Sequence, residues 1–325
     1  MLSARQRGTA VNLVFLDADS IGDDIDLSGF SELGNLTTYG TTEEQDVAER
    51  IRDADVVLVN KVEINEQTVG SCGRLKLVCV TATGTNNLDK EFLDRRRIAW
   101  RNAAGYSTEN VAQHTFAILF YLWEKLRYYD DYVKSGKYAA SGRFTNFSNA
   151  FHELKNKTWG IIGLGAIGRR VAGIAESFGC RVIYYSASGN PPQDGYEQVD
   201  LDTLLVESDI VSVHAPLNEY TQDLMNADAF RKMKPTAVFL NLGRGPIVVE
   251  QDLAVALTEG QIAAAGLDVL RVEPMEPDNP LLKITDSTRL LITPHMAWAS
   301  VEARTRLMEI VLEQVKDFFA SDTAD

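Results

Sequence analysis

Gly163-Leu164-Gly165-Ala166-Ile167-Gly168 lies between an apolar run, residues 158–162, and a helical pattern of apolar residues over 167–178. A glycine turn between a strand and a helix is the context of a dinucleotide-binding fingerprint. In that fingerprint the glycines allow a tight turn, an approach of the backbone to a pyrophosphate, and close packing of the helix on the strand. An ordinary turn can contain the same glycines, so the interpretation depends on the rest of the chain.

The composition is that of a globular protein with about two domains. The chain has 325 residues, of which 45% are hydrophobic and 24% charged. The net charge of −14 argues against a nucleic acid or an anionic membrane as partner. The three cysteines show no CxxC spacing, which predicts reduced thiols in a cytoplasmic protein and neither a disulfide framework nor a metal site. We see no signal peptide and no membrane-spanning run.

Apolar runs alternate with helical patterns on both sides of the glycine motif, which predicts an α/β fold with two doubly wound parallel sheets. Continuous apolar runs are typical of strands that are buried on both faces. In the first part, we expect strands at 11–16, 36–39, 55–59, 75–80 and 98–100 and a helix at 43–54. In the second part, we expect strands at 158–162, 181–185, 209–213, 237–241, 263–267 and 290–293.

Two long helical patterns suggest how these parts are connected. The first, over 109–134, is predicted to be one helix that links the domains, and the loose segment 135–149 after it could pack on a second subunit. The second, over 301–319, follows the second part and is expected to fold back onto the first. The dinucleotide-binding domain, 107–296, would then be an insertion in a discontinuous catalytic domain, 1–106 and 297–325.

Three polar side chains follow predicted strands of the second part, where open α/β sheets bind their ligands. Arg244 follows the strand at 237–241, Glu273 follows 263–267, and His295 follows 290–293. Each has an ordinary alternative when taken alone: a surface arginine, a solvated acid and a structural histidine. Together they form an acid–base set, because a hydrogen bond from His295 to Glu273 would favour the imidazolium form. Arg244 would bind and polarise a 2-oxo acid while hydride arrives from a nicotinamide cofactor.

These motifs resemble those of the D-isomer-specific 2-hydroxyacid dehydrogenases. The resemblance rests on GxGxxG at 163–168, NxxRG at 241–245, GLDV to Glu-Pro over 266–274 and TPH at 293–295, and it covers nearly the whole chain. It implies that Arg244, Glu273 and His295 are the catalytic trio, with His295 as the proton donor. It also implies a Rossmann domain inserted in a flavodoxin-like catalytic domain, and a homodimer formed through the helix and arm near 109–150.

Further matches point to the glycerate dehydrogenase and hydroxypyruvate reductase branch, through residues 60–61, 82–87, 105–108 and 295–300. By this resemblance, the substrate is bound by Lys61, Thr83, Gly84, Arg244 and Trp298. The residues implied in cofactor binding are Thr108, Gly163, Gly165, Ala166, Ile167, Gly168, Ser186, His214, Ala215, Pro216, Thr221, Leu242, Gly243 and Asp268. A structural role remains the alternative for His214, and we interpret His114 and His152 as structural.

The sequence departs from the fingerprint after its second strand. NAD-binding domains of this type have an Asp or Glu there that binds the ribose hydroxyls, whereas this chain has Ser186-Ala187-Ser188-Gly189. No Arg or Lys follows nearby to bind a 2′-phosphate, so NAD is expected and NADP remains open. The leading hypothesis is reduction of hydroxypyruvate, glyoxylate or a similar short 2-oxo acid. The alternative is a dinucleotide-sensing protein, like the C-terminal-binding-protein corepressors.

Overall fold

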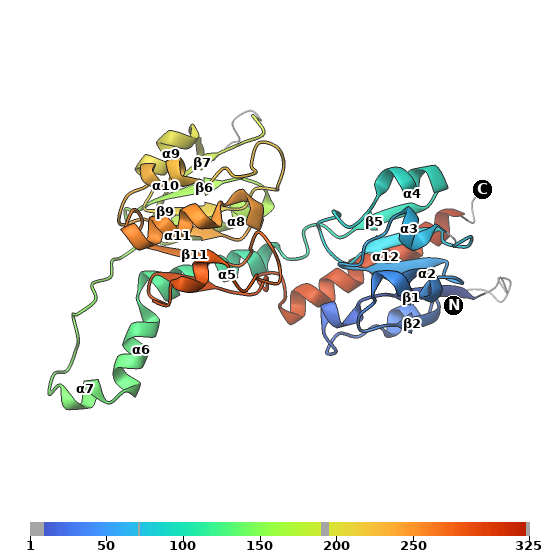
Figure 1. Cartoon of the computed structure of the whole chain (residues 1–325), viewed down its shortest axis with the longest axis horizontal. Coiled ribbons are helices and arrows are strands. Elements are labelled where there is room, and N and C mark those ends of the chain that lie inside the picture. Colours follow the sequence, from blue (N-terminus) through green and yellow to red (C-terminus); the bar gives the residue numbers. More distant parts are fainter. Residues whose placement is uncertain (1–9, 71, 190–194, 323–325) are drawn as a thin grey trace. The chain divides into compact units, whose positions relative to one another are not determined.

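The computed structural model describes residues 10–70, 72–189 and 195–322 of the chain. It consists of two compact units (Figure 1). One unit comprises Met1–Ser107 with Ala299–Asp325, and the other comprises Thr108–Trp298. Each is an α/β unit built on a parallel sheet, as the sequence predicts.

The first unit contains a five-stranded sheet in the order β2-β1-β3-β4-β5, the flavodoxin-like order. Strands β3 and β4 are buried along their whole length, because their uninterrupted apolar sequences face helices on both sides. The strands are β1 (Val11–Phe15), β2 (Gly34–Thr38), β3 (Val56–Val59), β4 (Leu77–Val80) and β5 (Ala99–Asn102). The helices are α1 (Ser28–Ser31), α2 (Val47–Arg50), α3 (Glu66–Val69), α4 (Lys90–Arg96) and α12 (Val301–Asp322).

The second unit contains a seven-stranded sheet in the order β12-β11-β10-β9-β6-β7-β8. Its strand order reverses between β6 and β9, the switch point at which doubly wound sheets bind ligands. The strands are β6 (Thr158–Ile162), β7 (Arg181–Tyr185), β8 (Glu197–Gln198), β9 (Ile210–Val213), β10 (Val238–Asn241), β11 (Ala264–Leu267) and β12 (Leu290–Ile292). The helices are α5 (Thr108–Trp123), α6 (Leu126–Lys134), α7 (Lys137–Ala140), α8 (Ala166–Ser177), α9 (Leu201–Glu207), α10 (Ala227–Lys232) and α11 (Glu250–Glu259).

Two apolar cores cover the faces of this second sheet. One packs α9, α10 and α11 against the sheet, with Phe230 and Phe239 at its centre. The other packs α5 and α8 against the opposite face, around Trp159 and Tyr184. Because both faces are covered, the loops at the carboxyl ends of the strands are the part of the unit that remains available for a ligand.

The prediction of one continuous helix over 109–134 is wrong. Helix α5 ends at Trp123 and α6 begins at Leu126, with Lys125 between them in the left-handed conformation at φ +56°. The apolar spacing runs across this break, but Leu126 is 48% exposed and belongs to the arm formed by α6 and α7. Spacing alone cannot show a break whose two sides both have helical periodicity.

Smaller differences concern short elements. The helix expected at 43–54 is only one turn of α-helix, α2, after a 3₁₀ turn at Glu44–Asp46. Strand β8 was not expected, because two polar edge residues carry no strand pattern. The three cysteines are buried and unpaired, and burial raises the pKa of Cys79 to about 12 and that of Cys180 to about 11. In the described ranges, no helix combines the length and the apolar composition needed to cross a membrane.

Candidate active site

The three glycines of the 163–168 motif have three different environments. Gly163 follows β6 with φ +95°, and a Cβ there would lie 2.7 Å from the Cα of Ala215. A Cβ on Gly168 would lie 2.3 Å from the carbonyl oxygen of Gly163. Gly165, the N-cap of the 12-residue helix α8, has open space beside it, with no atom within 4 Å of an added Cβ. The backbone at Gly165 can therefore be approached closely by a ligand, next to the free N–H groups of a helix start.

Arg244 lies on the loop that leaves β10. Asn241, at the end of this strand and fully buried, accepts the N–H of Gly243 at 3.1 Å and donates to the carbonyl of Arg244 at 3.0 Å. The guanidinium of Arg244 donates to the carbonyl of Gly243 at 2.8 Å. The buried amide of Asn241 thus fixes the backbone on both sides of Arg244. Asn241 was expected only as part of a motif, and this supporting function was not predicted for it.

Glu273 and His295 are in direct contact. The Oε2 atom of Glu273 lies 2.7 Å from Nδ1 of His295, and their side chains are 33% and 30% exposed. The other carboxylate oxygen of Glu273, Oε1, accepts the N–H of Leu270 at 2.8 Å. The hydrogen bond that the sequence predicts between these two side chains is therefore present.

The loop that carries His295 is held by Asp268. Asp268 is 2% exposed, and its carboxylate accepts the N–H groups of Met296 at 2.9 Å and Ala297 at 2.8 Å. It also accepts the hydroxyl of Thr293 at 2.6 Å, and its carbonyl accepts the N–H of His295 at 2.8 Å. These bonds hold His295 in a left-handed conformation at φ +51°. The carboxylate of Asp268 thus supports the loop from within the protein.

His114 lies beside this loop, which was not expected from the sequence. Its Nε2 atom is 3.1 Å from the hydroxyl of Thr293 and 3.6 Å from Oδ1 of Asp268. Its position on α5, three residues after the buried Val111, places it on the apolar face of that helix. The spacing of three residues from Val111 could therefore have predicted that the ring of His114 faces the protein interior.

His214 follows β9 at the switch point. Its Nε2 atom lies 3.1 Å from the hydroxyl of Ser212, which also accepts the indole N–H of Trp159 at 2.9 Å. Its Nδ1 atom is buried without a hydrogen-bond partner among the described residues. Burial lowers the pKa of His214 to about 3, so its ring is neutral near pH 7.

The remaining candidates of the second unit lie on the same loops. Ala215 packs against Gly163. A Cβ added to Gly243 would lie 3.0 Å from the carbonyl oxygen of Ala215. The hydroxyl of Thr221 donates to the carbonyl of Pro216 at 2.7 Å and so closes the loop after β9. Ala166 and Ile167 begin α8, Leu242 is buried after β10, Thr108 begins α5, and Trp298 ends the unit.

The described residues directly after β7, 186–189, contain neither an acid nor a base. The hydroxyls of Ser186 and Ser188 lie 3.1 Å apart. Arg181, at the start of the same strand, is bound to Glu197 and Glu207 at 2.7 Å each. Its guanidinium is therefore already paired with two carboxylates.

The candidate substrate residues of the first unit lie on loops after β3 and β4. The carboxylate of Asp17 accepts the N–H groups of Asn60 at 2.8 Å and Lys61 at 2.7 Å, which fixes the loop that carries Lys61. The hydroxyl of Thr83 donates to the carbonyl of Ala103 at 2.9 Å, and Gly84 follows on the same loop. Both loops are thus tied down by internal hydrogen bonds.

Comparison with known proteins identifies the family. Residues 116–297 match the family model "D-isomer specific 2-hydroxyacid dehydrogenase, NAD binding domain". The chain is 36% identical over 300 residues to a hydroxypyruvate reductase of Blautia hydrogenotrophica, covering 91% of this chain and 92% of that protein. It is 34% identical over 309 residues to a glycerate dehydrogenase of Methylorubrum extorquens, covering 95% and 96%.

This chain belongs to the D-isomer specific 2-hydroxyacid dehydrogenases. A solved relative is the NADPH-dependent glyoxylate/hydroxypyruvate reductase of Sinorhizobium meliloti in complex with NADP and malonate. It is 25% identical, with a TM-score of 0.80, and the match covers 96% of this chain and 94% of that chain. The dehydrogenase is thus an oxidoreductase that uses a nicotinamide dinucleotide, as the sequence predicts.

The residues of this dehydrogenase fit such a cofactor. The space beside Gly165 would be filled by the Cβ of any other residue, and it adjoins the start of α8. A pyrophosphate placed there would meet free N–H groups and the positive end of the helix. The matched region also contains Arg244, Glu273 and His295, on loops at the carboxyl ends of the strands.

Proposed function

We propose that this dehydrogenase interconverts a short 2-oxo acid, of the hydroxypyruvate or glyoxylate type, and the D-2-hydroxy acid. The observation that carries the proposal is the 2.7 Å contact between Nδ1 of His295 and Oε2 of Glu273. A carboxylate that accepts from one ring nitrogen orients the imidazole and stabilises the positive charge that forms on it during proton transfer. The names of the relatives, hydroxypyruvate reductase and glycerate dehydrogenase, support the same substrate class.

His295 is the general acid in reduction and the general base in oxidation. Because Nδ1 faces Glu273, the Nε2 atom is left to give a proton to the substrate oxygen. The bound dinucleotide supplies the hydride that the substrate carbon accepts. The guanidinium of Arg244 binds the carboxylate or the carbonyl oxygen and polarises the carbonyl. Proton transfer by a positioned histidine contributes about 10²–10⁴-fold to such reactions.

We assign substrate binding to Lys61, to the backbone N–H groups of Thr83 and Gly84, and to Trp298. Residues 1–106 and 297–325 form the substrate domain in this proposal, and residues 107–296 form the dinucleotide domain. The dinucleotide contacts are assigned to the glycine loop, to Ser186, to the loop after β9, and to Leu242, Gly243, Asp268 and Thr108. The cytoplasm is the proposed location, supported by the three buried, unpaired cysteines.

An assay with a panel of 2-oxo acids tests this proposal. Purified protein is mixed with NADH or NADPH and hydroxypyruvate, glyoxylate, pyruvate or a bulkier 2-oxo acid, and the absorbance of the reduced nicotinamide is followed. We expect turnover with hydroxypyruvate or glyoxylate and slower turnover with bulky acids. Tight binding of NADH without turnover on any member would favour the dinucleotide-sensing alternative and contradict the proposal.

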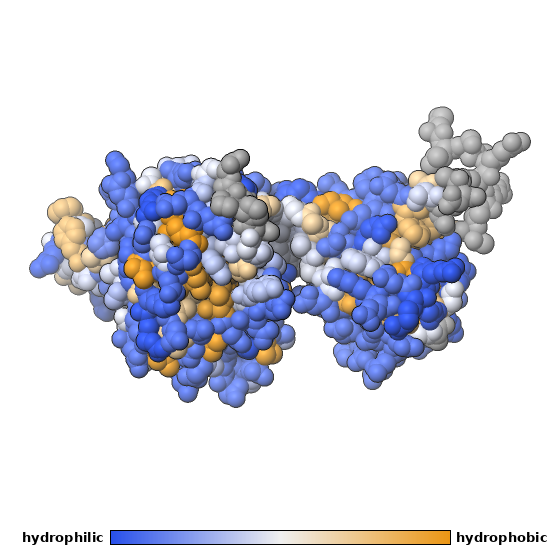
Figure 2. All heavy atoms as spheres, turned by 90° about the horizontal axis from the view of Figure 1, so that it is seen from above, coloured by the Kyte–Doolittle hydropathy of each residue, from blue (hydrophilic) through white to orange (hydrophobic). Residues whose placement is uncertain are grey.

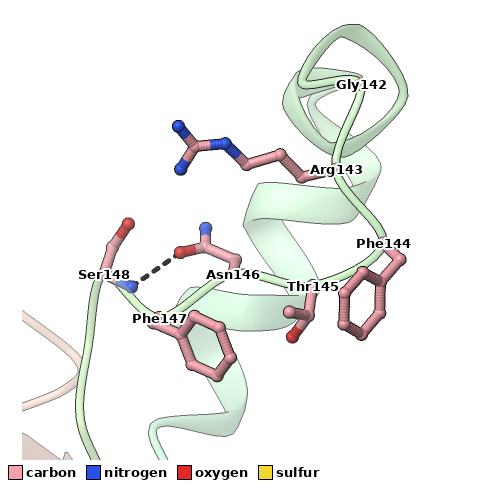
Figure 3. A pocket seen from close by; sticks show the side chains of 7 residues that line it. All are labelled: Gly142, Arg143, Phe144, Thr145, Asn146, Phe147 and Ser148. Carbon is pink, nitrogen blue, oxygen red and sulfur yellow. Dashed lines mark hydrogen bonds between the residues drawn. The ribbon is translucent and has the colours of Figure 1, made fainter.

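We also propose that the arm formed by α6, α7 and residues 141–151 binds a second copy of this chain. Phe144 is 91% exposed, Phe147 86% and Phe151 53%. Phe144 and Phe147 are among the residues, 142–148, that line an open hollow of about 640 Å³. Figure 2 shows apolar surface at the tip of the arm, at the left edge of the view. Figure 3 shows Arg143 pointing away from the rings of Phe144 and Phe147. Exposed aromatic side chains in such a cluster favour a protein partner.

A further inference from the structure

Glu250 is a buried acidic residue outside the proposed catalytic trio. It lies in the first turn of α11, six residues after Arg244, and is 9% exposed. Its Oε1 atom accepts the N–H of Arg271 at 2.6 Å, and its Oε2 atom accepts the side-chain amide of Asn279 at 2.7 Å. Burial of a carboxyl group costs free energy unless hydrogen bonds compensate for the lost water. The two groups that donate to Glu250 are therefore the ones that it holds in place.

The two partners of Glu250 enclose the segment that carries Glu273. Arg271 precedes Glu273 by two residues and Asn279 follows it by six. The N–H groups of the consecutive residues Leu270 and Arg271 therefore donate to two different carboxyl groups, that of Glu273 at 2.8 Å and that of Glu250 at 2.6 Å. The side chain of Glu273 is 33% exposed, so packing alone does not fix its orientation. Its orientation therefore depends on the position of the backbone of this segment.

The same segment is pressed against the loop of Arg244. A Cβ on Gly245 would lie 1.8 Å from the carbonyl oxygen of Leu270 and 2.5 Å from the nitrogen of Arg271. The guanidinium of Arg271 is anchored beside it, to Asp223 at 2.6 Å. Glu250 thus binds the segment at the point where the loop after Arg244 contacts it.

We propose that Glu250 is a positioning residue of this dehydrogenase, which holds the segment 270–279 so that Glu273 keeps its hydrogen bond to His295. The inference rests on the proposed function, since it concerns the same acid–base pair. A displacement of about 1 Å in a catalytic group can cost about 10²-fold in rate. Glu250 acts through the backbone and makes no contact with the reacting atoms in this proposal.

A swap of the Glu250–Asn279 pair tests this function. Both oxygens of Glu250 accept hydrogen bonds, from the N–H of Arg271 and from the side-chain amide of Asn279. In Glu250→Gln, an NH₂ group replaces one of these oxygens, so a donor faces a donor. In Asn279→Asp, two carboxyl groups face each other. The double variant Glu250→Gln/Asn279→Asp restores a donor opposite an acceptor, and the introduced carboxylate can still accept the N–H of Leu281, as Asn279 does at 3.0 Å. Glu259→Gln, at the exposed other end of α11, is the matched control.

The first readout is the steady-state reduction of hydroxypyruvate by NADH. We expect each single variant to lower kcat at least about tenfold with little change in the dissociation constant of NADH, measured by fluorescence. The double variant should recover to within about threefold of the wild-type kcat, and the control should not differ from it. Wild-type kcat in Glu250→Gln, or a double variant no faster than the single variants, would overturn the inference.

The second readout needs no turnover, so it separates this inference from the proposed function. The chain has four histidines, which makes ring nitrogen spectra of ¹⁵N-histidine-labelled protein readable, with His295 assigned by its loss in His295→Gln. In spectra recorded at a pH where the ring of His295 is neutral, we expect the wild type to carry the ring proton on Nδ1, facing Glu273, and Glu250→Gln to show mixed tautomers. An unchanged His295 spectrum in a folded Glu250→Gln protein would overturn the inference, even if hydroxypyruvate proves not to be a substrate.

Discussion

The Nδ1 atom of His295 lies 2.7 Å from the Oε2 atom of Glu273, although 22 residues separate them in the chain. The two side chains come from loops after different strands, β12 and β11, which are parallel neighbours in the sheet. Each loop is stabilised by a further hydrogen bond. The carboxylate of Asp268 accepts the N–H of Met296, beside His295, and the carboxylate of Glu273 accepts the N–H of Leu270 on its own loop. The contact is therefore a product of the sheet register and of two supporting networks.

The carboxylate of Glu273 should orient the ring of His295 for proton transfer. Glu273→Gln keeps the size of the side chain but removes the negative charge that lies 2.7 Å from Nδ1 and stabilises the positive ring as it forms. We expect kcat for reduction and for oxidation to fall by about 10²-fold, with the dissociation constant of NADH near that of the wild type. Steady-state kinetics in both directions and a fluorescence titration with NADH measure the two effects. A kcat within about threefold of the wild-type value in both directions would contradict the pairing.

Replacement by alanine should lower the stability of the protein at Gly168 and weaken cofactor binding at Gly165. Gly168→Ala places a Cβ 2.3 Å from the carbonyl oxygen of Gly163, so we expect it to lower stability by about 1–3 kcal/mol. Gly165→Ala meets no atom within 4 Å, so Tm should stay near that of the wild type while the KM for NADH rises about tenfold. Thermal unfolding without cofactor and steady-state kinetics measure the two effects. The reverse pattern would place the cofactor elsewhere.

Ser186 should determine how well the enzyme tolerates the 2′-phosphate of NADPH. The hydroxyls of Ser186 and Ser188 are neutral and can face either a ribose hydroxyl or a phosphate. In Ser186→Asp, a carboxylate would accept the ribose hydroxyls and repel the phosphate. We expect the ratio of kcat/KM for NADH to that for NADPH to rise at least about tenfold. Ser188→Ala is a control, and an unchanged ratio in Ser186→Asp would exclude this end of β7 from cofactor selection.

The aromatic arm should determine the oligomeric state. Phe144 and Phe147 are 91% and 86% exposed, so replacing both with serine removes apolar surface without disturbing a core. We expect the wild type to sediment as a dimer and the Phe144→Ser/Phe147→Ser variant to dissociate at micromolar concentration. Tyr220, which is 62% exposed outside the arm, supplies a control as Tyr220→Ser. A wild-type monomer, or a variant that remains a dimer, would contradict the proposed interface.

The parallel sheets were predictable from the sequence because their strands are uninterrupted apolar runs. All six strands expected in the second part are present, β6 and β7 with the expected bounds and the others within one residue of them. The break at Lys125 was not predictable, because a left-handed lysine between two amphipathic helices has no signature in apolar spacing. The polar edge strand β8 was missed for a related reason, since neither of its residues is apolar.

The contact between Glu273 and His295 could also be expected from the sequence, because loops after adjacent parallel strands meet at one edge of the sheet. The hydrogen-bond partners of the supporting residues could not. Asp268, His114 and Glu250 act through hydrogen bonds to backbone or side-chain groups far along the chain, as in the 179-residue separation of His114 from Thr293. Such partners depend on how each helix is positioned against the sheet. Apolar spacing shows which face of a helix is buried, but not which residues of the sheet that face contacts.

Single-turnover reduction of hydroxypyruvate by enzyme-bound NADH shows whether His295 transfers the proton. His295→Gln keeps a hydrogen-bonding side chain of similar size but cannot carry the proton. We predict that NADH binds to this variant with an affinity near that of the wild type, while the rate of hydride transfer to hydroxypyruvate falls by about 10²–10⁴-fold. A single-turnover rate within about threefold of the wild-type rate would show that His295 is not the proton donor.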